Sequence, residues 1–129
     1  MAAPNIVDVT SIYGKTAYAT PANTTENVLL ANTAASGKVL KINQIVVANV
    51  DGTSAADATV AYNTADGGTA DGGTSYPIIS TVSVPADASI IAVDKNTGIY
   101  LEEDRSIVVT SGTASDLTYT ISYEELDDA

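Results

Sequence analysis

Short apolar segments recur every 8 to 15 residues along this chain, separated by residues typical of turns. Strand-length segments at this spacing predict a β-sandwich or a barrel. The segments are rich in Val, Ile, Thr and Tyr, whose side chains suit a pleated sheet and lose rotamer freedom in a helix. No apolar stripe with the 3.6-residue period persists for three helical turns. We therefore predict an all-β fold: an antiparallel β-sandwich, jelly-roll or immunoglobulin-like, with about nine short strands.

Two segments define the expected sheets most clearly. From Leu117 to Tyr123, apolar residues alternate with Thr and Ser, which predicts a strand with one face in the core and places Tyr119 in that core. The segment from Val39 to Val50 is longer, and its apolar residues change parity midway. This strand is therefore either buried on both faces or carries a bulge near Asn43-Gln44.

The length of 129 residues matches one domain, so we expect residues 1–129 to form a single β-sandwich. At the N-terminus, residues 1–12 form either an extended arm that reaches a neighbouring subunit or an ordinary edge strand. The apolar residues that would make such a subunit or capsid contact are Ile6, Val7, Val9 and Ile12. At the other end, we expect residues 124–129 to be an acidic, frayed tail.

The composition excludes several kinds of chemistry. The chain has no Cys and no His, so we expect no thiolate nucleophile, no Ser–His triad and no Cys/His zinc site, and we predict that it is not an enzyme. A net charge of −11 argues against binding to nucleic acid. The first residues lack the basic and apolar regions of a signal peptide, and no apolar run is long enough to span a membrane. We predict no cofactor.

A repeated Thr-Ala-Asp-Gly-Gly motif at residues 64–73 has no apolar residue larger than Ala, which predicts an exposed, mobile loop. Its Asp66 and Asp71 are weak candidates for calcium ligands. Two carboxylates five residues apart supply too few of the six to eight oxygens that calcium prefers, unless Asp51 or Asp57 closes on them. We therefore expect no metal site here.

Two of the seven tyrosines, Tyr62 and Tyr76, border this loop and are the best candidates for surface aromatic contacts. Tyr13 and Tyr18 flank Gly14-Lys15, and one of them could be exposed. A tyrosine platform with a calcium loop is the basis of one alternative function, a carbohydrate-binding β-sandwich module. Loss of glycan binding on Tyr62→Ala or Tyr76→Ala would distinguish it from a purely structural protein.

Several stretches, spread over nearly the whole chain, resemble a family of small virion structural proteins of tailed phages that infect marine cyanobacteria. They are residues 5–12 (NIVxVTSI, where x is a position outside the match), 14–16 (GKT), 36–39 (SGKV), 47–53 (VANVDGT), 83–88 (SVPADA), 99–103 (IYLEE) and 122–125 (SYEE). The family pattern has Gly-Asp after its Leu-Glu-Glu element, whereas this chain has Asp104-Arg105.

The resemblance implies a non-enzymatic virion protein, most simply a decoration (cement) protein on the outside of the phage head that stabilises it. It implies the major capsid protein or other virion proteins as partners, either alone or together with other copies of the chain. The protein is then made in the host cytoplasm and located in the virion. The alternative within this class is a neck, tail or fibre component. The acidic charge would lie in turns and chain ends, leaving the less charged strands for docking.

Overall fold

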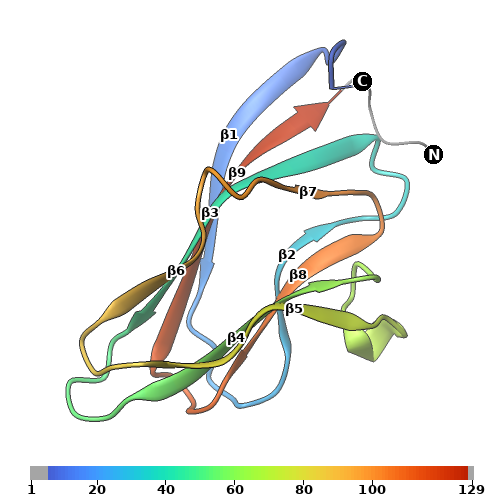
Figure 1. Cartoon of the computed structure of the whole chain (residues 1–129). Coiled ribbons are helices and arrows are strands. Elements are labelled where there is room, and N and C mark those ends of the chain that lie inside the picture. Colours follow the sequence, from blue (N-terminus) through green and yellow to red (C-terminus); the bar gives the residue numbers. More distant parts are fainter. Residues whose placement is uncertain (1–5, 128–129) are drawn as a thin grey trace.

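The structure of the protein, a computed structural model, describes residues 6–127 as two antiparallel sheets packed face to face (Figure 1). This confirms the predicted all-β sandwich. Nine strands lie in the described part of the chain: β1 Ser11–Ala19, β2 Asn27–Asn32, β3 Lys38–Asn49, β4 Ala56–Asn63, β5 Ser75–Val84, β6 Ser89–Val93, β7 Ile99–Leu101, β8 Arg105–Ser111 and β9 Leu117–Asp127. A single 3-10 turn, Thr69–Asp71, lies between β4 and β5.

The strand order identifies the sandwich as a jelly roll. The five-stranded sheet has the order β1-β9-β3-β6, with β7 pairing with a second part of β3, and the four-stranded sheet has the order β2-β8-β4-β5. If β6 and β7 are counted together as strand 6, then β8 becomes strand 7 and β9 becomes strand 8. The strand orders of the two sheets are then 1-8-3-6 and 2-7-4-5. That is the order of the double Greek key, so the structure selects one of the two predicted topologies.

A bulge in β3 explains its change of parity. The register of β3 on β9 shifts between Ile42 and Gln44, which leaves Asn43 as the extra residue. Ile42 is buried before the shift and Ile45 after it, although the two positions have opposite parity. The second reading of this segment, a bulge near Asn43-Gln44, is therefore confirmed.

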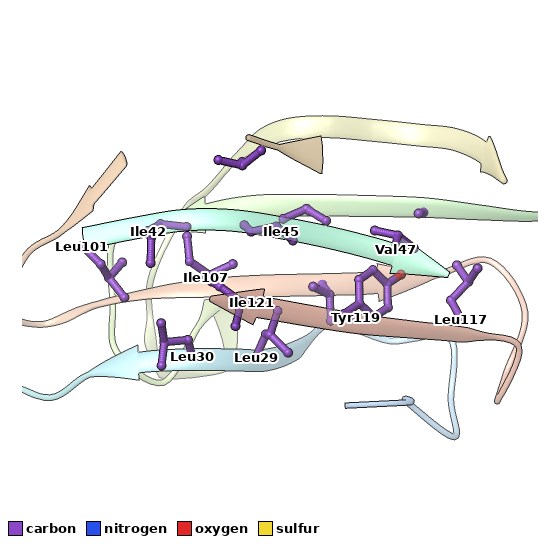
Figure 2. Close-up of a cluster of buried hydrophobic side chains, with 14 of the residues drawn as sticks. Leu29, Leu30, Ile42, Ile45, Val47, Leu101, Ile107, Leu117, Tyr119 and Ile121 are labelled. Atoms are coloured by element: carbon purple, nitrogen blue, oxygen red, sulfur yellow. The ribbon is translucent and has the colours of Figure 1, made fainter. Parts of the chain in front are cut away.

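The core between the sheets contains Leu, Ile, Val and Ala side chains with one fully buried aromatic residue, Tyr119 (Figure 2). Figure 2 shows Ile42, Ile45 and Val47 of β3 on the same side as Tyr119 and Ile121 of β9, facing the four-stranded sheet. The alternating pattern of Leu117 to Tyr123 thus predicted the buried face of β9 correctly.

The two ends of the described chain differ from expectation. We expected the N-terminal arm or edge strand to cover residues 1–12. Instead one strand, β1, begins at Ser11 and runs through Gly14, which pairs with Glu124 and has open space where a side chain would point. Residues 6–10 form a turn, and residues 1–5 of the expected arm lie outside the described residues.

We expected the acidic C-terminal segment to be frayed, but as far as Asp127 it is part of a sheet. It forms the last third of β9, which pairs with β1 on one side and with β3 on the other. Lysines on these neighbours compensate its charge: Lys15 and Lys38 each place Nζ 3.0 Å from an oxygen of Glu125. Residues 128–129 of the expected tail lie outside the described residues.

Candidate docking surface

The outer face of the five-stranded sheet is a broad surface with little charge, and we call it the neutral face. Register and burial together show which residues point outward, because residues directly opposite each other in neighbouring strands share a face. The neutral face consists of Ile12, Gly14, Thr16, Tyr18, Thr118, Thr120, Ser122, Glu124, Lys41, Gln44, Val46, Ala48, Ser89, Ile91 and Tyr100.

An uncharged row crosses the neutral face from one edge of the sheet to the other. Tyr18 lies opposite Thr120, Thr120 opposite Val46, and Val46 opposite Ile91. The outermost residues are strongly exposed, Tyr18 by 77% and Ile91 by 60%. Exposed apolar residues that line up across a sheet are a feature of surfaces that contact other macromolecules.

The electrostatics of the neutral face differ from those of the chain as a whole. Its two charged residues, Lys41 and Glu124, are opposite in sign and lie 3.9 Å apart, so its net charge is zero in a chain with a net charge of −11. A partner that packs on this face buries one ion pair and no excess of carboxylates. Such burial avoids the cost of desolvating an unpaired charge.

Many of the carboxylates lie in turns, as the sequence suggested, and several are bound there by backbone amides. An oxygen of Asp51 accepts a hydrogen bond from the Ser54 amide at 3.0 Å, and Asp94 accepts one from the Asn96 amide at 2.9 Å. Asp and Asn stabilise turns in this way. These acids therefore shape the ends of the sandwich while keeping their charge in water.

The two candidate calcium ligands are not brought into a site. Asp66 accepts a hydrogen bond from the Ala34 amide at 3.1 Å, and the side chain of Asp71 lies against Gly67. Asp57 is at the start of β4, whereas the loop follows the end of that strand. Among residues 6–127, no three acidic side chains gather where they could hold a metal ion.

Residues 64–74 are largely exposed, as we expected, but hydrogen bonds anchor them beside the four-stranded sheet. The Glu26 carboxylate accepts hydrogen bonds from the Thr69 amide at 2.9 Å, the Thr69 hydroxyl at 3.0 Å and the Ser75 hydroxyl at 2.7 Å. Burial alone raises the pKa of Glu26, but these hydrogen bonds outweigh it and leave the pKa below its usual value. Gly68 is buried against Val28 and Val108.

The two candidate surface tyrosines occupy different environments. Tyr62 is half-buried at the edge of the core, and its hydroxyl lies 3.4 Å from the Tyr100 carbonyl and 3.4 Å from the Glu102 amide. Burial raises the pKa of this hydroxyl. Tyr76, opposite Tyr62 in the ladder, is 61% exposed. Of this pair, only Tyr76 presents most of its surface to a ligand.

The four N-terminal contact candidates are divided between a turn and a strand. Ile6 and Val7 are exposed in the turn before β1, Val9 is half-buried, and Ile12 lies on β1 within the neutral face. The sequence did not single out Ile91, because β6 is short and its register on β3 shifts. Tyr13 and Tyr18 are both exposed, whereas the sequence suggested that one of them could be.

An ion cluster closes the end of the five-stranded sheet beside β1. Glu125 is bound by Lys15 from β1 and by Lys38 from β3, both at 3.0 Å. Burial raises the pKa of Glu125, but the hydrogen bonds and charges of the two lysines more than offset it, so the pKa falls below its usual value. The hydrogen bond and charge of Glu125 in turn raise the pKa of Lys38.

Comparisons with known proteins show the fold. No protein-family model and no curated protein matches the chain. A chain of the acid-stable capsid structure of Helicobacter pylori bacteriophage KHP30 has a TM-score of 0.52 and 9% identity, over 94% of this chain and 91% of that one. A chain of infectious bursal disease virus, Gt strain, has a TM-score of 0.37 and 12% identity, over 94% of this chain and 32% of that one. The chain therefore shares its fold, nearly end to end, with a chain of a phage capsid structure.

Proposed function

We propose that this protein is a non-enzymatic structural component of a virion. The observation that carries the proposal is the nearly end-to-end match to a chain of a phage capsid structure, because both chains consist of the same sandwich and little else. Jelly rolls are common in viral capsid proteins, although the fold alone does not fix a function. The sequence resemblance to virion proteins of tailed phages agrees with this assignment.

Within the virion, we place the protein on the outside of the head as a decoration protein that binds the major capsid protein. The neutral face supports this arrangement, since it can pack on a shell without burying unpaired carboxylates. The acidic turns would then remain at the sides and in solvent. A protein that bridges neighbouring shell subunits stabilises the particle, because it binds the assembled state and not the dissociated one.

The test is a quantitative one on purified virions of the phage that encodes the chain. We expect on the order of hundreds of copies per particle, as for a protein that repeats over a symmetric shell, and density for the jelly roll on the outer head surface in a reconstruction. A copy number of roughly a dozen or fewer would instead place the chain in the neck, tail or fibre. Absence of the chain from the particle would overturn the proposal.

The docking face is tested by rebinding to particles that lack the protein. Ser89→Glu combined with Ile91→Glu adds two charges to exposed positions of the neutral face and should abolish rebinding. A matched control, Tyr76→Glu with Val82→Glu, adds the same charge to exposed positions of β5 and should bind normally. Equal binding by both variants would refute the assignment of the neutral face.

The N-terminal contact remains a separate proposal. Val7 is 90% exposed, and the turn that carries it precedes β1. The Thr10 amide donates to the Asp127 carbonyl at 2.8 Å, so a deletion should stop before this residue. Removal of residues 1–9 should weaken particle binding and leave thermal stability nearly unchanged. Unchanged binding by a folded deletion variant would exclude this segment as a contact.

A further inference from the structure

Most edges of the two sheets are interrupted in a way that hinders further strand pairing. On β5, Pro77 lacks an amide donor, Thr81 has a φ of 46°, and the register on β4 shifts twice. The register of β2 on β8 shifts after Val28, and β6 is short and shifted on β3. Such devices protect natural sheets from edge-to-edge association.

β1 is an edge without these devices. All nine of its residues pair with β9 in an unbroken register, and it contains no proline and no residue with positive φ. Figure 1 shows it as the outermost strand beside β9, and among residues 6–127 no strand pairs with its other edge. A long, regular, unprotected edge strand is a template for strand addition.

The chemistry of β1 also suits association in a strongly acidic protein. Over Ser11–Ala19 there is no carboxylate, and the one charge, Lys15, is compensated by Glu125 at 3.0 Å. Three of its larger side chains are more than half exposed: Ile12 by 57%, Tyr13 by 55% and Tyr18 by 77%. Two molecules with a charge of −11 repel each other least through a surface of this kind.

We propose that two copies of this chain associate through β1, antiparallel about a two-fold axis, so that their five-stranded sheets join into one continuous sheet. A pairing that uses the whole of Ser11–Ala19 is centred on Lys15. It places Ile12 opposite Tyr18 of the second copy, and Tyr13 opposite Ala17 of the second copy. This inference concerns the protein in solution and does not depend on its role in a virion.

This register is self-complementary, which is why a second copy is the occupant we infer. The exposed aliphatic Ile12 meets the exposed ring of Tyr18 twice, once on each side of the axis, and such cross-strand pairs stabilise sheets. The large Tyr13 side chain meets the small Ala17. Lys15 faces its own copy, but Glu125 compensates each of these charges. The remaining repulsion is between two chains with a net charge of −11, so raising the salt concentration should strengthen the association by screening it.

The first test is the mass of the full chain in solution. Sedimentation equilibrium at about 100 μM should show a concentration-dependent mass that approaches twice the 13.1 kDa of the chain, since strand pairing alone makes a small and weak interface. A mass of one chain at every concentration would overturn the proposal. The edge of β1 would then be available to pair with a strand of another virion protein.

The second test locates the axis by using the absence of cysteine from the natural chain. Lys15→Cys places two cysteines directly opposite each other, with Cα atoms about 5 Å apart, within the range that a disulfide spans. Tyr13→Cys is the matched control on the same strand and the same side. In the inferred register its two copies lie four residues apart, about 14 Å, and cannot join. Mild oxidation should therefore give covalent dimer from Lys15→Cys and not from Tyr13→Cys.

The third test exchanges charges at the inferred pair. Ile12→Glu with Tyr18→Glu should abolish the dimer, because carboxylates then face each other on both sides of the axis. Ile12→Lys with Tyr18→Glu should restore it, because each pair becomes an ion pair. Both positions are exposed, so circular dichroism should show an intact fold. A dimer that survives the first variant, or a dimer not restored by the second, would overturn the β1 register.

Discussion

The hydroxyl of Tyr119 joins the two sheets across the core, and removing it should destabilise the protein measurably. Tyr119 is fully buried on β9, and its hydroxyl donates to the Thr110 carbonyl of β8 at 3.1 Å. Ser111 of β8, which is 1% exposed, lies 3.0 Å away. Since the tyrosine proton is directed to Thr110, the serine hydroxyl is the donor of this second bond. Burial raises the pKa of Tyr119, which keeps the hydroxyl neutral and able to donate.

Tyr119→Phe keeps the ring and removes both hydrogen bonds. It leaves the Thr110 carbonyl without its tyrosine donor and the buried Ser111 hydroxyl without its tyrosine acceptor, and unsatisfied buried groups cost about 1–3 kcal/mol each. We expect the free energy of unfolding to fall by about 2 kcal/mol, with a decrease in Tm of about 8 °C for a chain of this size. Ser111→Ala leaves the bond to Thr110 intact and should cost about 1 kcal/mol.

The combination of the two substitutions tests the physical reason. In the double variant no serine hydroxyl remains to be left unsatisfied, so its loss should be about 2 kcal/mol, smaller than the sum of the single losses. Urea and thermal unfolding followed by circular dichroism measure all three variants. Tyr123→Phe, on the same strand and only partly buried, is the control and should cost less than about 0.5 kcal/mol. Strict additivity, or a loss at position 119 no larger than the control, would refute the reasoning.

Three further predictions concern charge and backbone strain. Glu26 and Glu125 have pKa values below their usual value in the folded state. The stability that they contribute is therefore present above about pH 4.5 and is lost as the pH falls through the lower folded-state pKa values. Glu26→Gln should flatten the dependence of Tm on pH in this range. Gly68→Ala should lower the free energy of unfolding by about 1–2 kcal/mol in urea titrations, because Gly68 has a φ of 77° and a Cβ there would lie 2.9 Å from Glu26 Oε1. Thr81→Gly should raise the Tm by a few degrees in a thermal scan, since a β-branched residue at a φ of 46° is strained by about 1–2 kcal/mol. Glycine gives the unfolded chain more freedom, but this offsets only part of the strain that is relieved.

Local patterns predicted the parts of this fold that depend on neighbours in sequence. The change of parity in β3 located the bulge at Asn43 because burial alternates with residue number from Leu40 to Ile42 and again from Ile45 to Asn49. The turn at Asp104 also depends on local sequence, and the phage family that this chain resembles has Gly at this position. Asp104 has a φ of 61°, a conformation that Gly adopts freely and that Asp tolerates better than most residues. The left-handed conformation of this turn is therefore compatible with Asp in place of Gly.

Features that depend on distant residues could not be read from the sequence. The Gly-rich loop is anchored by Glu26, which lies 43 residues before Thr69, and no local pattern connects them. The acidic end of β9 continues as a strand because Lys15 and Lys38, on two different neighbours, meet Glu125. The neutral face likewise exists only once five strands are assembled in register. The candidate docking surface therefore needed the structure, whereas the fold class did not.

The position of β9 sets the order in which the protein can be built. β9 is the last strand in the described chain, yet it lies in the middle of its sheet, between β1 and β3. A ribosome must therefore finish residues 117–127 before β1 can pair with its neighbouring strand in the fold, since Ser11 pairs with Asp127. Pairings between such distant segments form slowly, in milliseconds to seconds. The nascent chain consequently exposes unpaired apolar strands until β9 has been synthesised, and its yield should depend on chaperones that bind such segments.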